Sequence, residues 1–107
     1  MSTLPKAELL NIADMIGYQE GAVVSRVLLK AETGNVTLFA FDQGQELSEH
    51  TAPFDALVHV IDGEVEVTIS GKSYQLKTSE AIVMPANQPH AIRATQRFKM
   101  LLTMIKA

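Results

Sequence analysis

Three histidines are the residues of this chain best suited to chemistry near neutral pH, because imidazole titrates in that range and binds transition metals. His50 and His59 lie in the stretch QGQELSEHTAPFDALVHVIDGEVEV, and His90 follows the loop sequence PANQP. The chain contains no cysteine, which excludes a thiol nucleophile, a zinc ribbon and a disulfide framework. His50 and His90 are therefore the first candidates for a functional site.

The composition is that of one globular domain. The chain has 107 residues, of which 47% are hydrophobic and 20% charged, so neither disorder nor a coiled coil is indicated. The net charge is −3, and the basic residues are scattered, whereas a nucleic acid or a membrane surface requires a basic patch. We expect neither partner. The N-terminal sequence lacks a signal-peptide pattern, and no apolar run approaches the roughly 20 residues of a membrane span, so a cytoplasmic location is expected.

Alternating apolar residues over short runs predict an all-β fold. The runs VVSRVLLKAE and NVTLFAFD are separated by TGN, and EVEVTIS and YQLKTS by SGKS, which predicts two hairpins. The pair Asp62-Gly63 predicts a third hairpin turn, between ALVHVI and EVEVTIS. In EVEVTIS the apolar residues share one face and Glu64 and Glu66 the other, which is typical of a strand with one solvated face. Evenly spaced strands of this kind indicate a sandwich or small barrel.

Residues 1–20 form an N-terminal arm of different character. Pro5 followed by KAELL predicts a short helix, and any helix is expected within these twenty residues. The arm sequence LLNIADMI has few apolar neighbours of its own, and the C-terminal FKMLLTMIK is almost continuously apolar. We therefore expect a homodimer in which the N-terminal segments contribute to the interface.

Motif spacing then gives a family resemblance. The chain resembles the cupin superfamily, whose first motif is G-x5-H-x-H-x3-4-E-x6-G and whose second is G-x5-P-x-G-x2-H-x3-N. It matches them at Gly44, His50, Gly63, Pro85 and His90 and departs from them at Ala52, Ala56, Ser79, Asn87 and Ala94. The resemblance implies a small, single-domain, type-2-like cupin over residues 1–107, with its core at 36–104. The implied fold is a double-stranded β-helix, or jelly-roll barrel.

The resemblance also implies where a metal would lie. In metal-binding cupins two histidines and a glutamate of the first motif converge with the histidine of the second, and here only His50 and His90 remain. Positions 50, 52 and 56 have the same strand parity, so they should line one site, whereas Asp55 and His59 should lie on the opposite face. Two imidazoles make a poor metal site. A divalent metal (Zn, Ni, Fe or Mn) would require a third ligand that the sequence does not identify.

Three functions are compatible with these residues. The favoured one is a small-molecule-binding cupin of unknown specificity, whose apolar pocket has His50, His90 and Gln88 as polar anchors and whose catalytic residues are not assigned. The second is a metal-dependent cupin enzyme using His50, His90 and an unidentified ligand, and the third is a non-enzymatic sensor or accessory module. If the two imidazoles share a cavity, at least one should titrate below its usual pKa of about 6.5. Both histidines could instead be satisfied structural residues.

Overall fold

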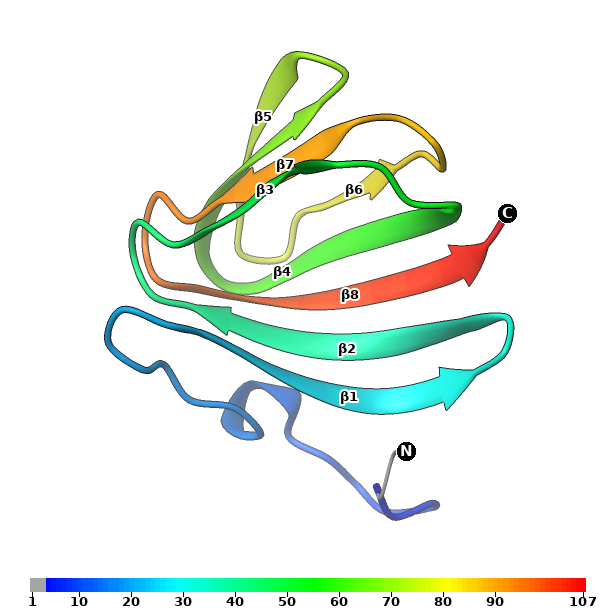
Figure 1. Ribbon diagram of the computed structural model, residues 1–107. Helices are drawn as coiled ribbons and strands as arrows, with labels where there is room; N and C mark the ends of the chain where they lie inside the picture. The colour runs from blue at the N-terminus through cyan, green and yellow to red at the C-terminus, as the bar shows by residue number, and fades with distance from the viewer. Residues whose placement is uncertain (1–3) are drawn as a thin grey trace.

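A curled antiparallel β-structure makes up nearly all of the chain in the computed structural model, which describes residues 4–107 (Figure 1). The elements in chain order are a 3-10 helix η1 (Ile12–Asp14) and the strands β1 (Val23–Ala31), β2 (Gly34–Phe41), β3 (Glu46–His50), β4 (Phe54–Ile69), β5 (Lys72–Lys77), β6 (Ala81–Met84), β7 (His90–Arg93) and β8 (Phe98–Lys106). The predicted all-β fold is confirmed. The described residues have helix only in the first twenty, as expected, but it begins at Ile12 and not after Pro5.

Strand β4 joins the two layers of the barrel. The path of hydrogen-bonded strands runs β1-β2-β8-β4-β7-β3, and β5 and β6 also pair with β4. The first part of β4 pairs with β8 and β6, while its second part, from Glu64, pairs with β5 and β7. The long strand β4 therefore belongs to both sheets and connects them, as its curved path in Figure 1 shows.

The hairpin predicted at Asp62-Gly63 is wrong. These two residues lie inside β4, where the pairing with β8 shifts register between Val60 and Asp62. Gly63 has φ +81°, and a Cβ atom there would clash with the backbone carbonyl of Arg97. Gly63 therefore lies at a β-bulge where β4 bends from one sheet to the other. Only glycine can adopt this φ and also leave room for so close a neighbouring strand.

The other two predicted hairpins are confirmed. β1 and β2 are joined at Glu32–Thr33, since Ala31 pairs with Gly34. β4 and β5 are joined by Ser70 and Gly71, which have φ values of +49° and +84°. Two successive positive φ values are the mark of a type I′ turn, whose twist matches that of the strands it connects.

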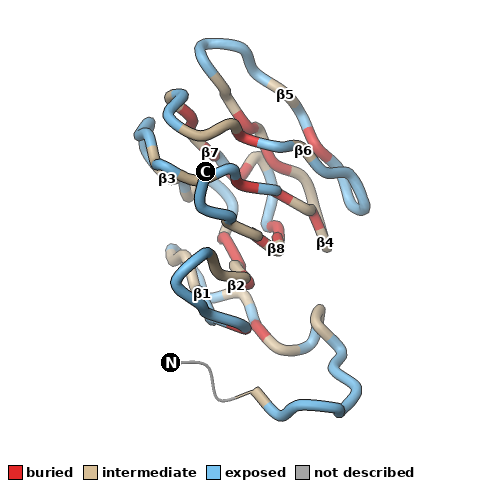
Figure 2. Tube along the Cα trace, turned by 90° about the vertical axis from the view of Figure 1, so that its right-hand side faces the viewer, coloured by how far each residue is buried: buried red, intermediate tan, exposed pale blue. Residues whose placement is uncertain are grey.

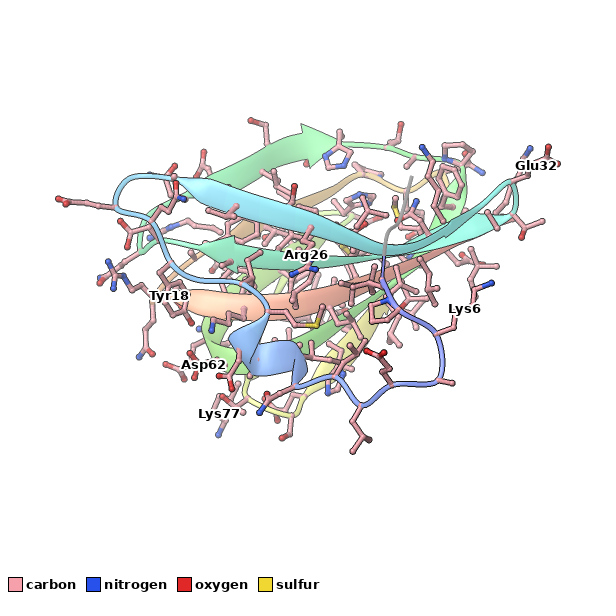
Figure 3. All side chains as sticks on the ribbon, turned by 90° about the horizontal axis from the view of Figure 1, so that it is seen from below. Lys6, Tyr18, Arg26, Glu32, Asp62 and Lys77 are labelled. Carbon is pink, nitrogen blue, oxygen red and sulfur yellow. The ribbon has the colours of Figure 1, made fainter. Side chains whose placement is uncertain are left out.

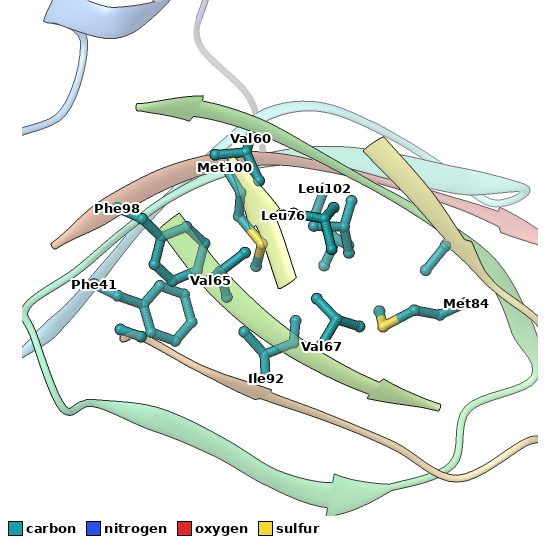
Figure 4. Packing of buried hydrophobic residues seen from close by; sticks show 13 residues of the cluster. Phe41, Val60, Val65, Val67, Leu76, Met84, Ile92, Phe98, Met100 and Leu102 are labelled. Carbon is teal, nitrogen blue, oxygen red and sulfur yellow. The ribbon is translucent and has the colours of Figure 1, made fainter. Parts of the chain in front are cut away.

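The main core lies inside the barrel, between the two sheets (Figure 4). Val65 and Val67 are fully buried, as the alternation in EVEVTIS predicts, and the rings of Phe41 and Phe98 stack with centroids 4.7 Å apart. Along β4 the buried positions are separated by intermediate or exposed ones, and in the first part of β8 buried positions alternate with intermediate ones (Figure 2). Each of these fully buried apolar side chains contributes about 1.5–3 kcal/mol, so the barrel is held from within.

The N-terminal arm packs on the outside of the same chain. Ile12, Met15 and Ile16 join a second apolar cluster with Leu28 and Leu38 of β1 and β2. Polar contacts fix the arm further. The Tyr18 hydroxyl donates to Asp62 at 2.5 Å, and Figure 3 labels both residues. Lys99 Nζ donates to the Ala13 carbonyl at 2.6 Å. The outer face of the sheet therefore supplies apolar neighbours for Ile12, Met15 and Ile16, whereas Leu9 and Leu10 of the same segment are exposed.

No helix of the length and apolar character that a bilayer span requires occurs within residues 4–107.

Candidate functional site

A small cavity opens between the two sheets at the end of the barrel where β3, β4 and β7 meet. Its volume is about 50 Å³, and it is lined by Leu47, His50, Ala52, Phe54, Ala56, Met84, His90, Ile92, Leu102 and Met104. Positions 50, 52 and 56 line the same cavity, which agrees with their shared parity in the sequence. Apolar side chains form the deep walls, since Ala56, Met84 and Ile92 are all buried.

The only imidazoles lining this cavity, His50 and His90, face each other across neighbouring strands. They are directly paired residues of β3 and β7, and their Nε2 atoms are 3.2 Å apart. The rings meet edge to face, with centroids 4.4 Å apart. His90 is only 4% exposed, whereas His50 lies at the exposed mouth. His90 therefore lies in the apolar wall of the cavity, and His50 is accessible to solvent.

The backbone fixes the orientation of both rings. Nδ1 of His50 contacts the Ser48 carbonyl at 2.7 Å, and Nδ1 of His90 contacts the Gln88 carbonyl at 3.1 Å. Because a carbonyl oxygen only accepts, both Nδ1 atoms carry their hydrogen, and the neutral rings present Nε2 lone pairs to each other. Two acceptors at 3.2 Å repel unless a proton, a cation or a donor group lies between them. The arrangement thus presents two acceptors to an electrophilic or hydrogen-donating group.

Gln88 contacts the site through its backbone carbonyl and not through its side chain. Its carbonyl accepts from His90, while its side-chain Oε1 accepts from the Ser70 hydroxyl at 3.0 Å. The side chain is not among the groups that line the cavity. A backbone contact depends on chain path and not on residue type, so the sequence offers no signal for it.

Asp55 anchors the loop that carries His90. Its carboxylate accepts from the backbone N–H of Ala86 at 2.9 Å, and the Ala52 carbonyl accepts from the N–H of Asn87 at 2.8 Å. Asn87 takes φ +64°, so asparagine replaces the motif glycine in the left-handed conformation it tolerates best among non-glycine residues. Ser79, at the other replaced glycine, has φ +75°. The motif's turn geometry therefore survives both substitutions.

His59 and two glutamates that precede His50 in the chain lie outside this cavity. His59 is on the opposite face of β4 from Ala56, paired with Ala81 and Leu101, and is half-buried. Glu46 and Glu49 line a shallow hollow outside the barrel and not the histidine cavity.

The donor set does not fit a firmly held resident metal. Within residues 4–107 no three side chains of His, Cys, Asp or Glu are grouped closely enough to hold an ion. Structural zinc sites use four protein ligands and catalytic ones three, whereas this cavity supplies two imidazoles and, at positions 52 and 56, two methyl groups.

The pKa of His90 is lowered, first by burial and second by the neighbouring His50, while the hydrogen bond to Gln88 opposes the shift. The unfolded chain therefore binds a proton at higher pH than the folded one. We predict that the free energy of unfolding is insensitive to this residue above about pH 6.5 and declines as the pH falls from there through the lowered pKa.

Urea unfolding at a series of pH values between about 8 and 5 measures this dependence. The variant His90→Gln should lose most of it, and His59→Gln should retain it. A wild-type free energy of unfolding that rises as the pH falls from 6.5 would contradict the prediction.

A jelly-roll barrel with its histidines on adjacent strands at one open end is the architecture of the cupins. The sequence profile of the cupin domain matches residues 37–106, and the chain therefore belongs to the cupin family. The match runs from within β2 to the end of β8 and so includes both His50 and His90.

Individual relatives agree with this assignment. A conserved protein of unknown function from Streptococcus pyogenes is 34% identical with a TM-score of 0.92, covering 97% of this chain and 91% of its own. A cupin 2 conserved barrel domain protein from Leptotrichia buccalis is 43% identical with a TM-score of 0.88, covering 91% of this chain and 47% of its own. The polyketide synthase CurC of Streptomyces cyaneus is 26% identical over 72 residues, which are 66% of this chain. The chain spans about half the length of that curated relative, 47%.

Proposed function

We propose that this protein is a small-molecule-binding cupin, in which the imidazoles of His50 and His90 hold the polar end of the ligand. The observation that carries the proposal is the pair of Nε2 atoms 3.2 Å apart at an apolar cavity, with both Nδ1 atoms already bonded to the backbone. Ligand sites typically combine apolar walls with a few convergent polar groups. The pair presents two acceptors to one hydrogen-donating group, such as an enol, phenol or carboxylic acid hydroxyl.

The size of the cavity limits what enters it. A volume of about 50 Å³ is far below the roughly 300–1,000 Å³ of sites that enclose a whole drug-sized molecule. Only the polar group of the ligand is therefore expected between the walls. Its carbon skeleton would lie at the mouth, where Phe54, Met104 and Leu47 are partly exposed.

A nuclear magnetic resonance screen of metal-free, untagged protein tests the proposal. A panel of small phenols, enols and carboxylic acids is added, and we expect saturable shifts of the Ala52 and Ala56 methyl signals and of the His50 and His90 rings. The His59 ring, on the outer face of β4, serves as the internal control. If no member of the panel moves the two alanine methyl signals saturably, the cavity is not a ligand site.

A metal-dependent cupin enzyme is the second candidate, favoured by one observation. Two imidazole lone pairs that converge at 3.2 Å are an arrangement that a cation stabilises. The name of the polyketide synthase relative suggests the substrate class for either candidate, since polyketide chains carry β-dicarbonyl groups whose enols donate a proton and chelate metals.

The cytoplasmic location expected from the sequence is part of the same proposal and is tested by cell fractionation.

We also propose that two copies associate through the outer edge of β1. This strand stands at one end of the hydrogen-bonded path within the described residues. Leu29 on it is 61% exposed, and Ile105 of β8, across β2, is 59% exposed. Both border a shallow hollow of about 510 Å³. Exposed apolar side chains gathered at one end of a sheet favour association with a second copy.

We predict a dimer mass by light scattering at micromolar concentration. Leu29→Lys should shift the mass toward the monomer, because a charge in the interface would lose its water. Val83→Lys is the matched control, since Val83 is 53% exposed on β6, away from β1. A monomeric wild type at this concentration would refute the dimer.

A further inference from the structure

We infer that the N-terminal arm and the outer face of the sheet form a second binding site, which takes a single aliphatic chain ending in a carboxylate. The site, here called the arm groove, has a volume of about 620 Å³ and lies between residues 4–12 and the strands β1, β2 and β8. It shares no lining residue with the histidine cavity. Leu101 of β8 lines the groove, while its neighbour Leu102 lines the cavity on the other face of the sheet. The groove can therefore be occupied whatever the cavity binds.

The arm stands away from the sheet between two anchored points, which is why a groove exists. The 3-10 helix η1 packs on the outer face of the sheet through Ile12, and Leu4 packs there at the other end of the segment. Residues 5–10 make no hydrogen bond to a strand within the described chain. The backbone turns at Ala7, whose φ of +59° is uncommon for alanine. The segment therefore arches over the sheet, as the ribbon on both sides of Lys6 shows in Figure 3.

The walls of the arm groove suit an aliphatic chain. Its floor is apolar, with Leu28 buried and Val36 and Leu101 partly buried. Leu10 and Leu29 also line it, yet they are 41% and 61% exposed. The volume of about 620 Å³ lies within the roughly 300–1,000 Å³ of small-molecule sites. A bound chain would cover the two exposed leucines, so the burial of apolar surface favours binding.

The charges at the arm groove select the head group of the ligand. Lys6 and Lys30 line it, and no Asp or Glu of the described chain does so. Neither lysine forms an ion pair with a described residue. Ammonium groups without a counter-charge beside an apolar floor favour an anion, and a carboxylate accepts charge-assisted hydrogen bonds from them. An amphiphile with a neutral or cationic head group lacks this match.

Decanoate is the probe, titrated into untagged, full-length protein and followed by nuclear magnetic resonance of methyl groups. We expect saturable 1:1 shifts of the Leu28, Val36 and Leu101 signals, while the Ala52 and Ala56 signals of the histidine cavity stay in place. Affinity should fall about threefold to fourfold for each methylene removed, from decanoate through octanoate to hexanoate. Decyltrimethylammonium, which carries the opposite charge on the same chain, should bind about tenfold more weakly than decanoate.

Matched variants locate the bound chain. Leu10→Asp should weaken decanoate binding at least about tenfold, because a carboxylate would then line the groove beside the chain. Leu9→Asp should leave the affinity unchanged, since Leu9 is fully exposed and does not line the groove. Lys6→Gln should weaken binding about threefold to fivefold. Lys77→Gln, at an exposed lysine of β5, should not weaken it.

Four outcomes would overturn the inference. Shifts confined to Ala52 and Ala56 would place decanoate in the histidine cavity. Equal losses of affinity in Leu9→Asp and Leu10→Asp, or equally tight binding of decyltrimethylammonium, would show that no site selects the chain or its charge. Groove signals that respond to dilution of the protein but not to decanoate would mean that a second copy covers the groove. The absence of any saturable shift would leave the groove without this ligand.

Discussion

The double variant Ala52→His, Ala56→Glu should retain close to one equivalent of a divalent metal after dialysis, whereas the wild type should retain little. Both alanines line the cavity with His50 and His90, so the new side chains would complete a set of three imidazoles and one carboxylate. Zinc or nickel content of untagged protein, prepared without a chelator, measures the result.

Thermal unfolding gives this prediction a second readout. Ala56 is 3% exposed, so the metal-free double variant should be less stable than the wild type because a larger, charged side chain is forced into the wall. Metal at about 1,000 times its dissociation constant adds about 4 kcal/mol to the folded state, which corresponds to a rise in Tm of more than about 10 °C. The wild type should show almost no such rise.

A control variant tests whether metal binding depends on where the new side chains lie and not only on their chemical types. Ala52→His with Leu57→Glu carries the same side chains, but Leu57 lies on the outer face of β4 and is 39% exposed. It should retain less metal than the double variant, because its three imidazoles converge in the cavity but its carboxylate does not. Stoichiometric metal in the wild type would reveal a third ligand already in place. Absence of metal from the double variant would mean that His50 and His90 do not converge on an ion.

Gly63→Ala should strongly destabilise the folded protein. The substitution places a methyl group against the Arg97 carbonyl at φ +81°, so it combines left-handed strain with a clash between two backbones. We expect a loss of more than about 3 kcal/mol, against a total stability of about 5–15 kcal/mol for a domain of this kind. The free energy of unfolding in urea measures it.

Gly71→Ala is the matched control. Gly71 has φ +84°, but a Cβ atom there would meet nothing within 4 Å. The control should cost only about 1 kcal/mol, the strain term alone. Equal losses in the two variants would mean that the bulge in β4 relaxes around Arg97 and that the contact between strands carries no energy.

The strands and the histidine pair are what the sequence determines most directly. Alternation in EVEVTIS placed Val65 and Val67 in the core because side chains of a strand point to opposite faces with a period of two. The same period placed His50, Ala52 and Ala56 at one cavity. Such local rules hold wherever one face of a strand is buried, so the parity of the site could be derived without a structure.

Only the tertiary structure decided the function of residues whose partners are distant in the chain. Asp62-Gly63 has the composition of a hairpin turn, yet β8 runs alongside it and extends the strand through a bulge. The apolar arm sequence around Ile12 and Ile16 fits an intermolecular interface equally well, but Leu28 and Leu38 of its own sheet cover it. In both cases the local pattern fits two environments, and a long-range contact selects one of them.

The sequence alone likewise did not predict the detailed geometry of the cavity. The two Nδ1 atoms are bonded to the carbonyls of Ser48 and Gln88, which leaves the two Nε2 atoms, with their lone pairs, 3.2 Å apart. These contacts depend on backbone groups that every residue type carries. Asp55 became a loop anchor because β6 and β7 bring Ala86 within 2.9 Å of its carboxylate. Residue types fix which groups are available for chemistry, whereas the pairing of strands fixes which of them meet.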